Sequence, residues 1–353
     1  MKRISLLVFL ACCLLIPTCF AMETLVYMLR SHTPVNRSST PSTALQSLQQ
    51  HYKSITILSP QAYQINDKGV VTNGVDAEVL AFSRTNNVKL MVLVTNRQFD
   101  TQQVHSFLAN PEAQQKAIHS LVDLCEKNHF YGVQLDFEMV DIKDKAPLTA
   151  FFLAATQALH EHHMVVSLAI APVVSDHDFP TVFLRKVYEH WQGAYDLPAL
   201  ANSADFFTVM AYNQHEGKTT PGSTATLPWV EATLQYTLQY IKPEKISLGI
   251  PAFSTFWFLG QDPQSGKLSA KMADIPYQKV QSILEKNKAS LVWNKTDKIN
   301  YAVYQRGWLN QYLFVEDAKS FKAKLALVKK YHLRGISIFD IGSEDPDIWS
   351  VLK

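Results

Sequence analysis

The chain has 353 residues, of which 47% are apolar and 18% are charged, and 33 basic residues stand against 31 acidic ones. Such a nearly balanced charge argues against a polyanionic partner such as nucleic acid. The length and apolar content allow one large core, for which a barrel of about 250 residues with an insertion would account.

The first 21 residues have the pattern of a secretory signal peptide. Lys2 and Arg3 precede an apolar stretch over residues 4–17, and small residues stand at positions 19 and 21. The apolar stretch is shorter than the roughly 20 residues that a bilayer span needs. We therefore predict cleavage after Ala21, a secreted or periplasmic protein, and no membrane anchor.

Three of the four cysteines lie within this predicted signal peptide, which leaves Cys125 alone in the mature chain. One thiol forms no internal disulfide, so we expect Cys125 to be a buried apolar residue on a helix. Lipidation at Cys19 is a weaker alternative to cleavage after Ala21, because Pro17 and Thr18 replace the small residues usual before a lipidated cysteine.

Short β-branched segments alternate with longer amphipathic stretches along the chain. Between the third and fourth of these segments, Asn110 is a predicted helix cap, followed by Pro111 and Glu112 in the first turn. Strand and helix alternating about eight times predict an α/β fold, a (β/α)8 TIM barrel. A doubly wound sheet is the alternative, ranked lower because no glycine-rich phosphate loop follows the first strand. The eight predicted strands are residues 23–29, 54–60, 88–95, 131–138, 164–174, 205–212, 245–251 and 334–342.

The regular spacing stops after residue 253. About 60 residues follow before a helix that begins near Glu316, and a connection this long should carry its own structure. Residues 277–287 predict a short helix, and the aromatic-rich residues 291–315 predict strands. We therefore expect a small α+β insertion over residues 254–316, between strands 7 and 8 of a barrel domain over residues 22–353.

The segment YGVQLDFE, residues 131–138, places Gln134, Asp136 and Glu138 on one face of the fourth strand. In a barrel this polar face points inward, where burial and mutual repulsion raise the pKa of at least one carboxyl group. Glu138 falls at the carboxyl end of the strand, which is the catalytic face of such barrels. These features favour a proton donor, and the alternative is a structural network of ion pairs.

Residues 131–138 resemble the signature of glycoside hydrolase family 18, which includes chitinases and endo-β-N-acetylglucosaminidases. The usual pattern is D-G-x-D-x-D-x-E, in which Tyr131 and Gln134 replace the first two acids. Three further stretches resemble family segments in order and spacing. Two other stretches look most like the family branch related to spore-cortex and peptidoglycan-processing enzymes. The first three are residues 209–215, 245–253 and 312–349; the other two are residues 93–96 and 223–251.

The resemblance implies a substrate-assisted retaining mechanism at β-1,4 linkages next to N-acetylglucosamine. Glu138 would act as the acid and then the base, Asp136 would bind the acetamido N–H, and Tyr212 would bind the acetamido oxygen. Because the substrate supplies the nucleophile, we expect no cofactor and no metal. The implied partner is chitin, peptidoglycan or a glycan, and we expect a monomer.

Six further residues are candidates for substrate contact. The amide of Gln134 is expected to hydrogen-bond Asp136, while Phe339 takes the place of a tryptophan that commonly forms the floor under the cleaved sugar. Asn213 stands where the family often has Asp. These departures leave open a chitinase-like lectin that binds without cleaving, although retention of Glu138 favours the enzyme. The six candidates are Gln134, Met210, Asn213, Trp257, Phe339 and Asn96.

Three further sets of residues lie outside the motif: an aromatic set in the insertion, Asn96, and a run of histidines. Two or three aromatic residues of the insertion are expected to face the substrate groove. Trp257 is the favoured one, because it directly follows the seventh strand. Asn96 ends the third strand, where a sugar contact and a turn cap are equally expected. The histidines at 160–163 end a helix on the opposite face, so we expect no metal there.

Overall fold

The computed structural model describes residues 22–29, 40–261, 266 and 268–352. The predicted signal peptide and its cleavage site lie outside the described residues. Within the described part of the chain, none of the helices has the length and apolar character needed to cross a bilayer.

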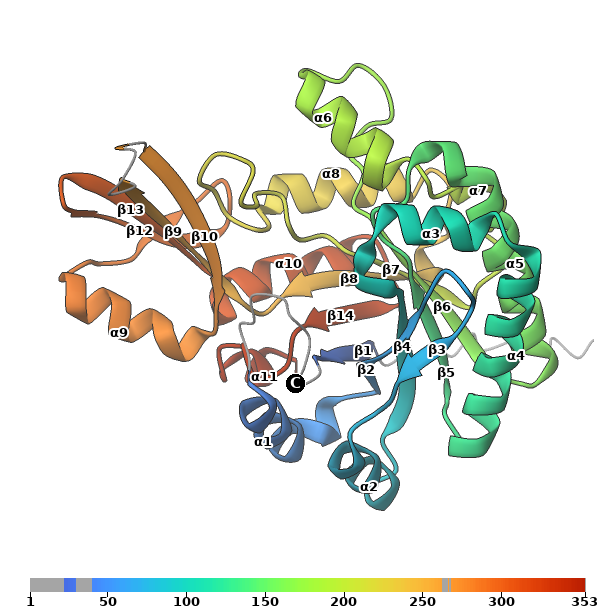
Figure 1. Cartoon of the computed structure of the whole chain (residues 1–353). Helices are drawn as coiled ribbons and strands as arrows, with labels where there is room; N and C mark the ends of the chain where they lie inside the picture. Colours follow the sequence, from blue (N-terminus) through green and yellow to red (C-terminus); the bar gives the residue numbers. More distant parts are fainter. Residues whose placement is uncertain (1–21, 30–39, 262–265, 267, 353) are drawn as a thin grey trace, which may run out of the picture.

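Eight parallel strands form a closed barrel, which confirms the predicted fold class (Figure 1). Neighbours follow the order β1, β14, β8, β7, β6, β5, β4, β2, and pairing of β1 with β2 closes the ring. A short strand, β3 (Val71–Asn73), pairs antiparallel with β2 outside this ring. The barrel strands are β1 (Glu23–Met28), β2 (Ile57–Ile65), β4 (Lys89–Asn96), β5 (Gly132–Asp136), β6 (Val165–Ile170), β7 (Phe206–Val209), β8 (Ile246–Pro251) and β14 (Gly335–Phe339).

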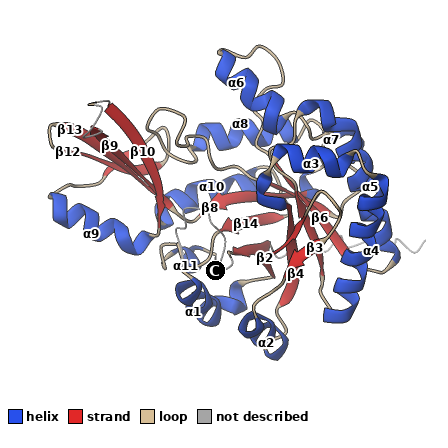
Figure 2. Cartoon of the chain, viewed as in Figure 1, coloured by secondary structure: helices blue, strands red, loops and turns tan. Residues whose placement is uncertain are grey.

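Helices surround the barrel on its outer side, as Figure 2 shows. The helix predicted after Asn110 is confirmed, since the Asn110 side chain accepts a hydrogen bond from the Ala113 N–H. Cys125 is buried on that helix, also as expected. The helices are α1 (Pro41–His51), α2 (Ala77–Thr85), α3 (Thr101–Leu108), α4 (Pro111–Asn128), α5 (Lys145–Glu161), α6 (Val182–Val187), α7 (Leu197–Leu200), α8 (Leu227–Thr237), α10 (Ala318–Lys330) and α11 (Ile348–Val351).

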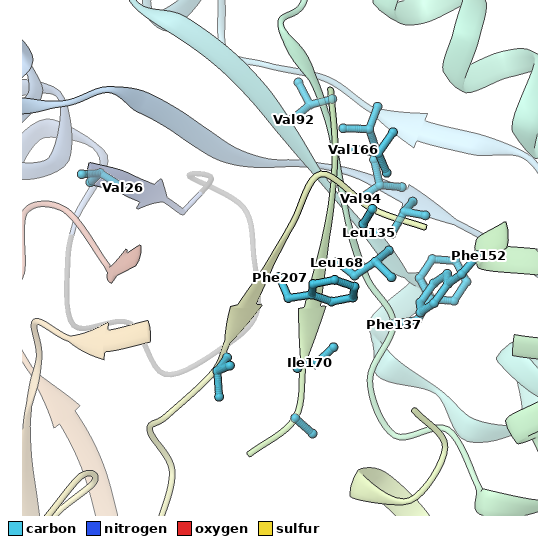
Figure 3. Close-up of a cluster of buried hydrophobic side chains, with 14 of the residues drawn as sticks. Val26, Val92, Val94, Leu135, Phe137, Phe152, Val166, Leu168, Ile170 and Phe207 are labelled. Carbon is cyan, nitrogen blue, oxygen red and sulfur yellow. The ribbon is translucent and has the colours of Figure 1, made fainter. Parts of the chain in front are cut away.

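The main core lies between the barrel wall and the helices. Side chains alternate along each strand, so one set packs outward against the helices and the other fills the barrel. Figure 3 shows the outward set, which includes Val92, Val94, Leu135, Val166, Leu168, Ile170 and Phe207. Gln134 and Asp136 therefore point into the barrel, on the face opposite Val133 and Leu135.

Five of the predicted strands end earlier than expected at their carboxyl ends, and in β5 and β7 this affects predicted catalytic residues. These two strands end at Asp136 and Val209, so Glu138 and Tyr212 lie just beyond the ladders. After β7 the backbone turns back on itself, since the Tyr212 N–H donates to the Met210 carbonyl at 2.8 Å. This turning brings side chains from neighbouring strand ends toward a common mouth.

The insertion is a five-stranded antiparallel sheet packed against one helix, to the left in Figure 1. The predicted helix over residues 277–287 is confirmed as α9 (Tyr277–Asn287), and the aromatic-rich segment forms three strands. A hairpin at the start of the insertion was not predicted, because its residues lack a clear alternation of apolar and polar types. The strands are β9 (Ser254–Gln261), β10 (Leu268–Ile275), β11 (Val292–Asn294), β12 (Ile299–Arg306) and β13 (Leu309–Val315).

Replacement of Gly132 is expected to destabilise the barrel. A Cβ atom at Gly132 would lie 1.9 Å from the Val165 carbonyl oxygen on β6, and backbone on both sides leaves little room to adjust. Gly132→Ala should therefore lower the free energy of unfolding by about 3 kcal/mol or more, measured by denaturant unfolding. Gly217→Ala is the control, since a Cβ there meets nothing within 4 Å. Equal stability of the two variants would contradict this account.

Candidate active site

A cavity of about 240 Å³ opens at the carboxyl ends of the barrel strands. All three predicted catalytic residues line it, and so do three of the predicted substrate contacts. The lining residues are Tyr27, Leu29, Gln61, Leu93, Phe99, Asp136, Glu138, Met139, Ala169, Trp191, Met210, Tyr212, Asn213, Phe253, Asp274 and Phe339. Three other predicted contacts, Gln134, Asn96 and Trp257, lie outside this lining.

Asp136 is 5% exposed and ends strand β5. Its Oδ1 atom has no hydrogen-bond partner among the described residues. Burial, followed by the charge of Glu138, raises the pKa of Asp136 well above its usual range. A buried carboxyl oxygen without a partner is costly, so a hydrogen bond donated by a ligand that reaches Asp136 through the cavity would stabilise this group.

Glu138 is held at both its backbone and its side chain. The Asn96 amide accepts from the Glu138 N–H and donates to the Glu138 carbonyl oxygen, each at 3.0 Å. The indole N–H of Trp191 donates to Glu138 Oε2, also at 3.0 Å. Burial raises the pKa of Glu138 to about 7, the Trp191 hydrogen bond opposes this rise, and the charge of Glu216 adds to it. A pKa near 7 suits a group that gives and takes a proton near neutral pH.

Trp191 was not among the predicted site residues. It lies on a single π-helical turn, Tyr188–Gln192, of the kind often found at functional sites. The residues on either side anchor this turn: His190 Nδ1 lies 2.8 Å from Asp141 Oδ2, and Gln192 donates to the Pro172 carbonyl at 2.7 Å. Trp191 is 53 residues from Glu138 along the chain, and no local pattern connects the two.

Tyr212 and Phe339 form an aromatic wall of the cavity. Their rings stack with centroids 5.1 Å apart at an interplanar angle of 22°. Burial raises the pKa of Tyr212 well above its usual range, so its hydroxyl stays protonated and available as a donor. Phe339 is partly exposed in the place predicted for a sugar floor, and Met210 is buried in the wall beside it.

Asn213 is exposed at the rim with a positive φ of 66°, a conformation that asparagine tolerates better than most residues. Its backbone N–H donates to Thr224 Oγ1 at 2.9 Å, and the residue lines the cavity. The sugar contact predicted for Asn213 stays a prediction.

Asp274, on β10 of the insertion, adds a third carboxyl group to the lining and was not predicted. Burial, followed by the charge of Asp340, raises the pKa of Asp274 to about 7. The insertion therefore contributes a carboxyl group to the cavity lining.

Gln134 does not contact the cavity, which corrects the prediction of a substrate contact and of a bond to Asp136. It is fully buried one level below Asp136, within a hydrogen-bonded layer that extends across six barrel strands. Gln134 accepts from the Tyr27 hydroxyl at 2.6 Å and donates to Ser167 at 2.8 Å and Thr208 at 3.0 Å. Ser337 continues the layer to Thr208 and to Ser247 on β8. The side-chain amide of Gln134 is thus bonded to Tyr27, Ser167 and Thr208 on other strands and not to Asp136.

Two other predicted contacts are corrected by the structure. Asn96 is 2% exposed and uses its amide to hold the Glu138 backbone, so it positions the acid and does not line the cavity. Trp257 is fully buried in the insertion sheet, where its indole N–H donates to the Gly222 carbonyl at 2.9 Å. A fully buried ring offers no face for stacking on a sugar.

The histidines at the end of α5 are engaged in separate surface contacts. His160 Nε2 lies 2.9 Å from Asp205 Oδ2, and His162 Nδ1 lies 2.7 Å from Glu126 Oε1. Within the described ranges, no group of three or more His, Cys, Asp or Glu side chains is arranged to hold a metal ion.

The family model for glycosyl hydrolases family 18 matches residues 35–345. The chain belongs to this family. It is therefore a glycoside hydrolase, and the pair Asp136 and Glu138 matches the end of the family 18 signature.

Sequence relatives of this family 18 chain include two Bacillus subtilis proteins. An uncharacterized glycosylase, YvbX, is 23% identical over 87% of this chain and 86% of its own length. A cortical fragment-lytic enzyme is 23% identical over 85% of this chain and 67% of its own length.

Solved structures show the same fold. The Bacillus megaterium spore cortex-lytic enzyme SleL has a TM-score of 0.79 at 24% identity, covering 94% of this chain and 73% of that one. A chitinase from Chromobacterium violaceum has a TM-score of 0.80 at 21% identity, covering 94% of this chain and 98% of that one.

Loss of the Trp191 hydrogen bond should change the pH dependence of this family 18 site. In Trp191→Phe the Glu138 carboxylate loses a donor, so its pKa rises and the acid stays protonated to higher pH. The alkaline limb of the kcat profile should therefore move up by about one pH unit, the effect of one charge-assisted hydrogen bond. The profile is measured with a chromogenic glycoside.

Trp229→Phe is the control for this experiment. Trp229 lines a neighbouring pocket together with Trp191 and has no hydrogen bond to Glu138. An unchanged or downward-shifted limb in Trp191→Phe would contradict the role given to the indole N–H.

Proposed function

We propose that this glycoside hydrolase cuts β-1,4 linkages at N-acetylglucosamine in chitin-like or peptidoglycan polymers by a substrate-assisted retaining mechanism. The observation that carries the proposal is that Asp136, whose buried Oδ1 has no partner among the described residues, lines the same cavity as Glu138 and Tyr212. Asp136 offers an acceptor for the N–H of a 2-acetamido glycoside, and Tyr212 offers a donor for its acetamido oxygen. Glu138 offers a proton for the leaving group.

In the first step, Glu138 transfers a proton to the glycosidic oxygen as the bond from that oxygen to the anomeric carbon breaks. Trp191 occupies Oε2, so the transferable proton resides on Oε1. The acetamido carbonyl oxygen of the substrate forms the new bond to the anomeric carbon, giving a cyclic oxazolinium ion. Asp136 accepts the acetamido N–H and stabilises the positive charge, while the Tyr212 hydroxyl donates to the acetamido oxygen.

In the second step, the Glu138 carboxylate takes a proton from a water molecule, and the water oxygen attacks the anomeric carbon. The bond to the acetamido oxygen breaks, which restores the acetamido group and leaves the configuration unchanged. Both protein carboxyl groups return to their starting protonation states, so the cycle needs no further group.

The polymer class rests on the relatives and on the sequence pattern of the first residues. By their names, the relatives act on spore cortex, on cortical fragments or on chitin. A predicted signal peptide over residues 1–21 is consistent with a polymer outside the cytoplasm. We therefore place the protein outside the cytoplasmic membrane, secreted or periplasmic.

Replacement of the acid tests the reaction. Glu138→Gln removes the transferable proton and keeps the side-chain shape, so turnover should fall by at least about 1,000-fold while binding remains. Products from chito-oligosaccharides and from purified peptidoglycan are compared by mass spectrometry for the native chain and the variant. Binding without cleavage by both forms would overturn the enzyme in favour of a chitinase-like lectin.

The stereochemistry of the first product tests the mechanism. Because two displacements occur at the anomeric carbon, new reducing ends should appear first as the β-anomer in proton NMR spectra recorded during hydrolysis. Oligosaccharides with a free amine at the cleaved sugar lack the nucleophile and should resist cleavage there. Initial release of the α-anomer would exclude the retaining scheme even if Glu138 is the acid.

A further inference from the structure

Three aromatic residues of the insertion, Tyr301, Tyr312 and Phe314, line a second hollow, separate from the cavity that holds Asp136 and Glu138. This insertion hollow has a volume of about 360 Å³ and shares no lining residue with that cavity. One wall is the insertion sheet, with Tyr301, Val303, Tyr312 and Phe314. The other is the loop between β7 and α8, and the turn between β11 and β12 closes one side.

Strand register explains why these side chains share one face. Tyr301 lies opposite Phe314, and Val303 lies opposite Tyr312, on the paired strands β12 and β13. The alternate residues, such as Ala302, belong to the core packed against α9. The insertion sheet therefore turns its aromatic face toward the β7–α8 loop and its smaller apolar face toward its own helix.

The side chains in the insertion hollow are only partly buried. Tyr301, Tyr312 and Phe314 are of intermediate exposure and Val303 is 46% exposed. The hydroxyl groups of the two tyrosines make no hydrogen bond to any residue in the described part of the chain. Flat rings with free hydroxyls fit a pyranose ring, which has apolar faces and a rim of hydroxyl groups.

Polar groups at the edge of the hollow are held in place. The His215 ring lies against Gly222, where a Cβ atom would be 2.4 Å from the ring, and His215 Nδ1 is 3.0 Å from the Thr220 carbonyl. On the facing turn, Asn294 donates to Asp297 at 2.5 Å. Such preformed hydrogen-bonding groups reduce the ordering cost of binding a ligand.

The same loop connects the hollow to the catalytic cavity. Asn213 lines the cavity, and His215, two residues further on, lines the hollow. The Gln214 N–H donates to the Thr224 carbonyl, and Trp257 beneath the loop donates to the Gly222 carbonyl, each at 2.9 Å. The loop is thus fixed to the insertion sheet, and the two binding surfaces keep a constant relation.

We propose that the insertion hollow is a second carbohydrate-binding site, which holds one or two pyranose units of the polymer whose chain is cut in the catalytic cavity. Its volume lies in the range of small-ligand sites. The identity of the polymer, but not the presence of the site, rests on the proposed function. A second site on one chain raises retention on a long polymer without changing the bond-breaking step.

Binding stoichiometry tests this proposal. In the Glu138→Gln chain, which keeps the polymer intact, equilibrium dialysis with labelled chitotetraose should find two sites per chain. Adding Tyr301→Ala and Tyr312→Ala should leave one. The pair Tyr301→Phe and Tyr312→Phe keeps both rings, so it should retain two sites with the second one weakened, and it guards against loss of folding in the alanine variant.

Trp308→Ala is the matched control. Trp308 is 94% exposed in the turn between β12 and β13 and does not line the hollow, so its removal should leave two sites. The proposal would be overturned if the Glu138→Gln chain bound chitotetraose at one site both with and without the tyrosine replacements. It would also be overturned if Trp308→Ala lost a site as the tyrosine replacements do. One site that disappears with the tyrosine replacements would support the hollow while removing support for sugar binding in the catalytic cavity.

Discussion

The hydrogen-bonded layer inside the barrel is the constraint on which the site depends. Gln134 lies at its centre, and Tyr27, Ser167, Thr208, Ser247 and Ser337 complete it. Buried polar groups are costly unless all are paired, so this layer is stable in one register only. A shift of β5 by one residue would point Gln134 at the helices and break three hydrogen bonds. The same register directs Asp136 into the cavity, with Glu138 just beyond it.

A neutral layer under the carboxyl groups simplifies their electrostatics. Because Gln134 carries no charge, the pKa of Asp136 is raised by burial and by Glu138, with no third acid beneath it. The pKa of Glu138 reflects opposing effects: burial and the charge of Glu216 favour the neutral acid, and the Trp191 N–H favours the carboxylate. In this chain the hydrogen bond that lowers the pKa of the acid therefore comes from a separate π-helical turn and not from strand β5.

The parts of the protein that follow from periodicity could be predicted from the sequence. The eight strands, helix α9 and the inward face carrying Asp136 and Glu138 repeat at the spacing of two or 3.6 residues that local geometry requires. Tyr212 and Phe339 could be placed through a resemblance of whole segments. Trp191 could not, because its contact with Glu138 depends on how a 53-residue stretch of chain returns to the barrel.

The wrong predictions for Gln134, Asn96 and Trp257 also arise from contacts between distant parts of the chain. Gln134 and Asn96 are polar residues near the mouth, and sequence does not show whether a polar group pairs with the protein or remains for a ligand. Trp257 was placed by its position after the seventh strand, but the unpredicted hairpin of β9 and β10 takes it into the insertion sheet. Whether an aromatic ring is covered is decided by the loop that lies over it, here through Gly222.

The layer centred on Gln134 also closes the bottom of the cavity. Its side chains fill the barrel, as in other small barrels, so the cavity ends above this layer and opens toward the carboxyl ends of the strands. In the proposed reaction, the released chain must leave and the attacking water must enter from that side. A sugar hydroxyl waiting at the mouth competes with this water for the oxazolinium ion, and the length of time the departing chain remains there sets the balance between hydrolysis and glycosyl transfer.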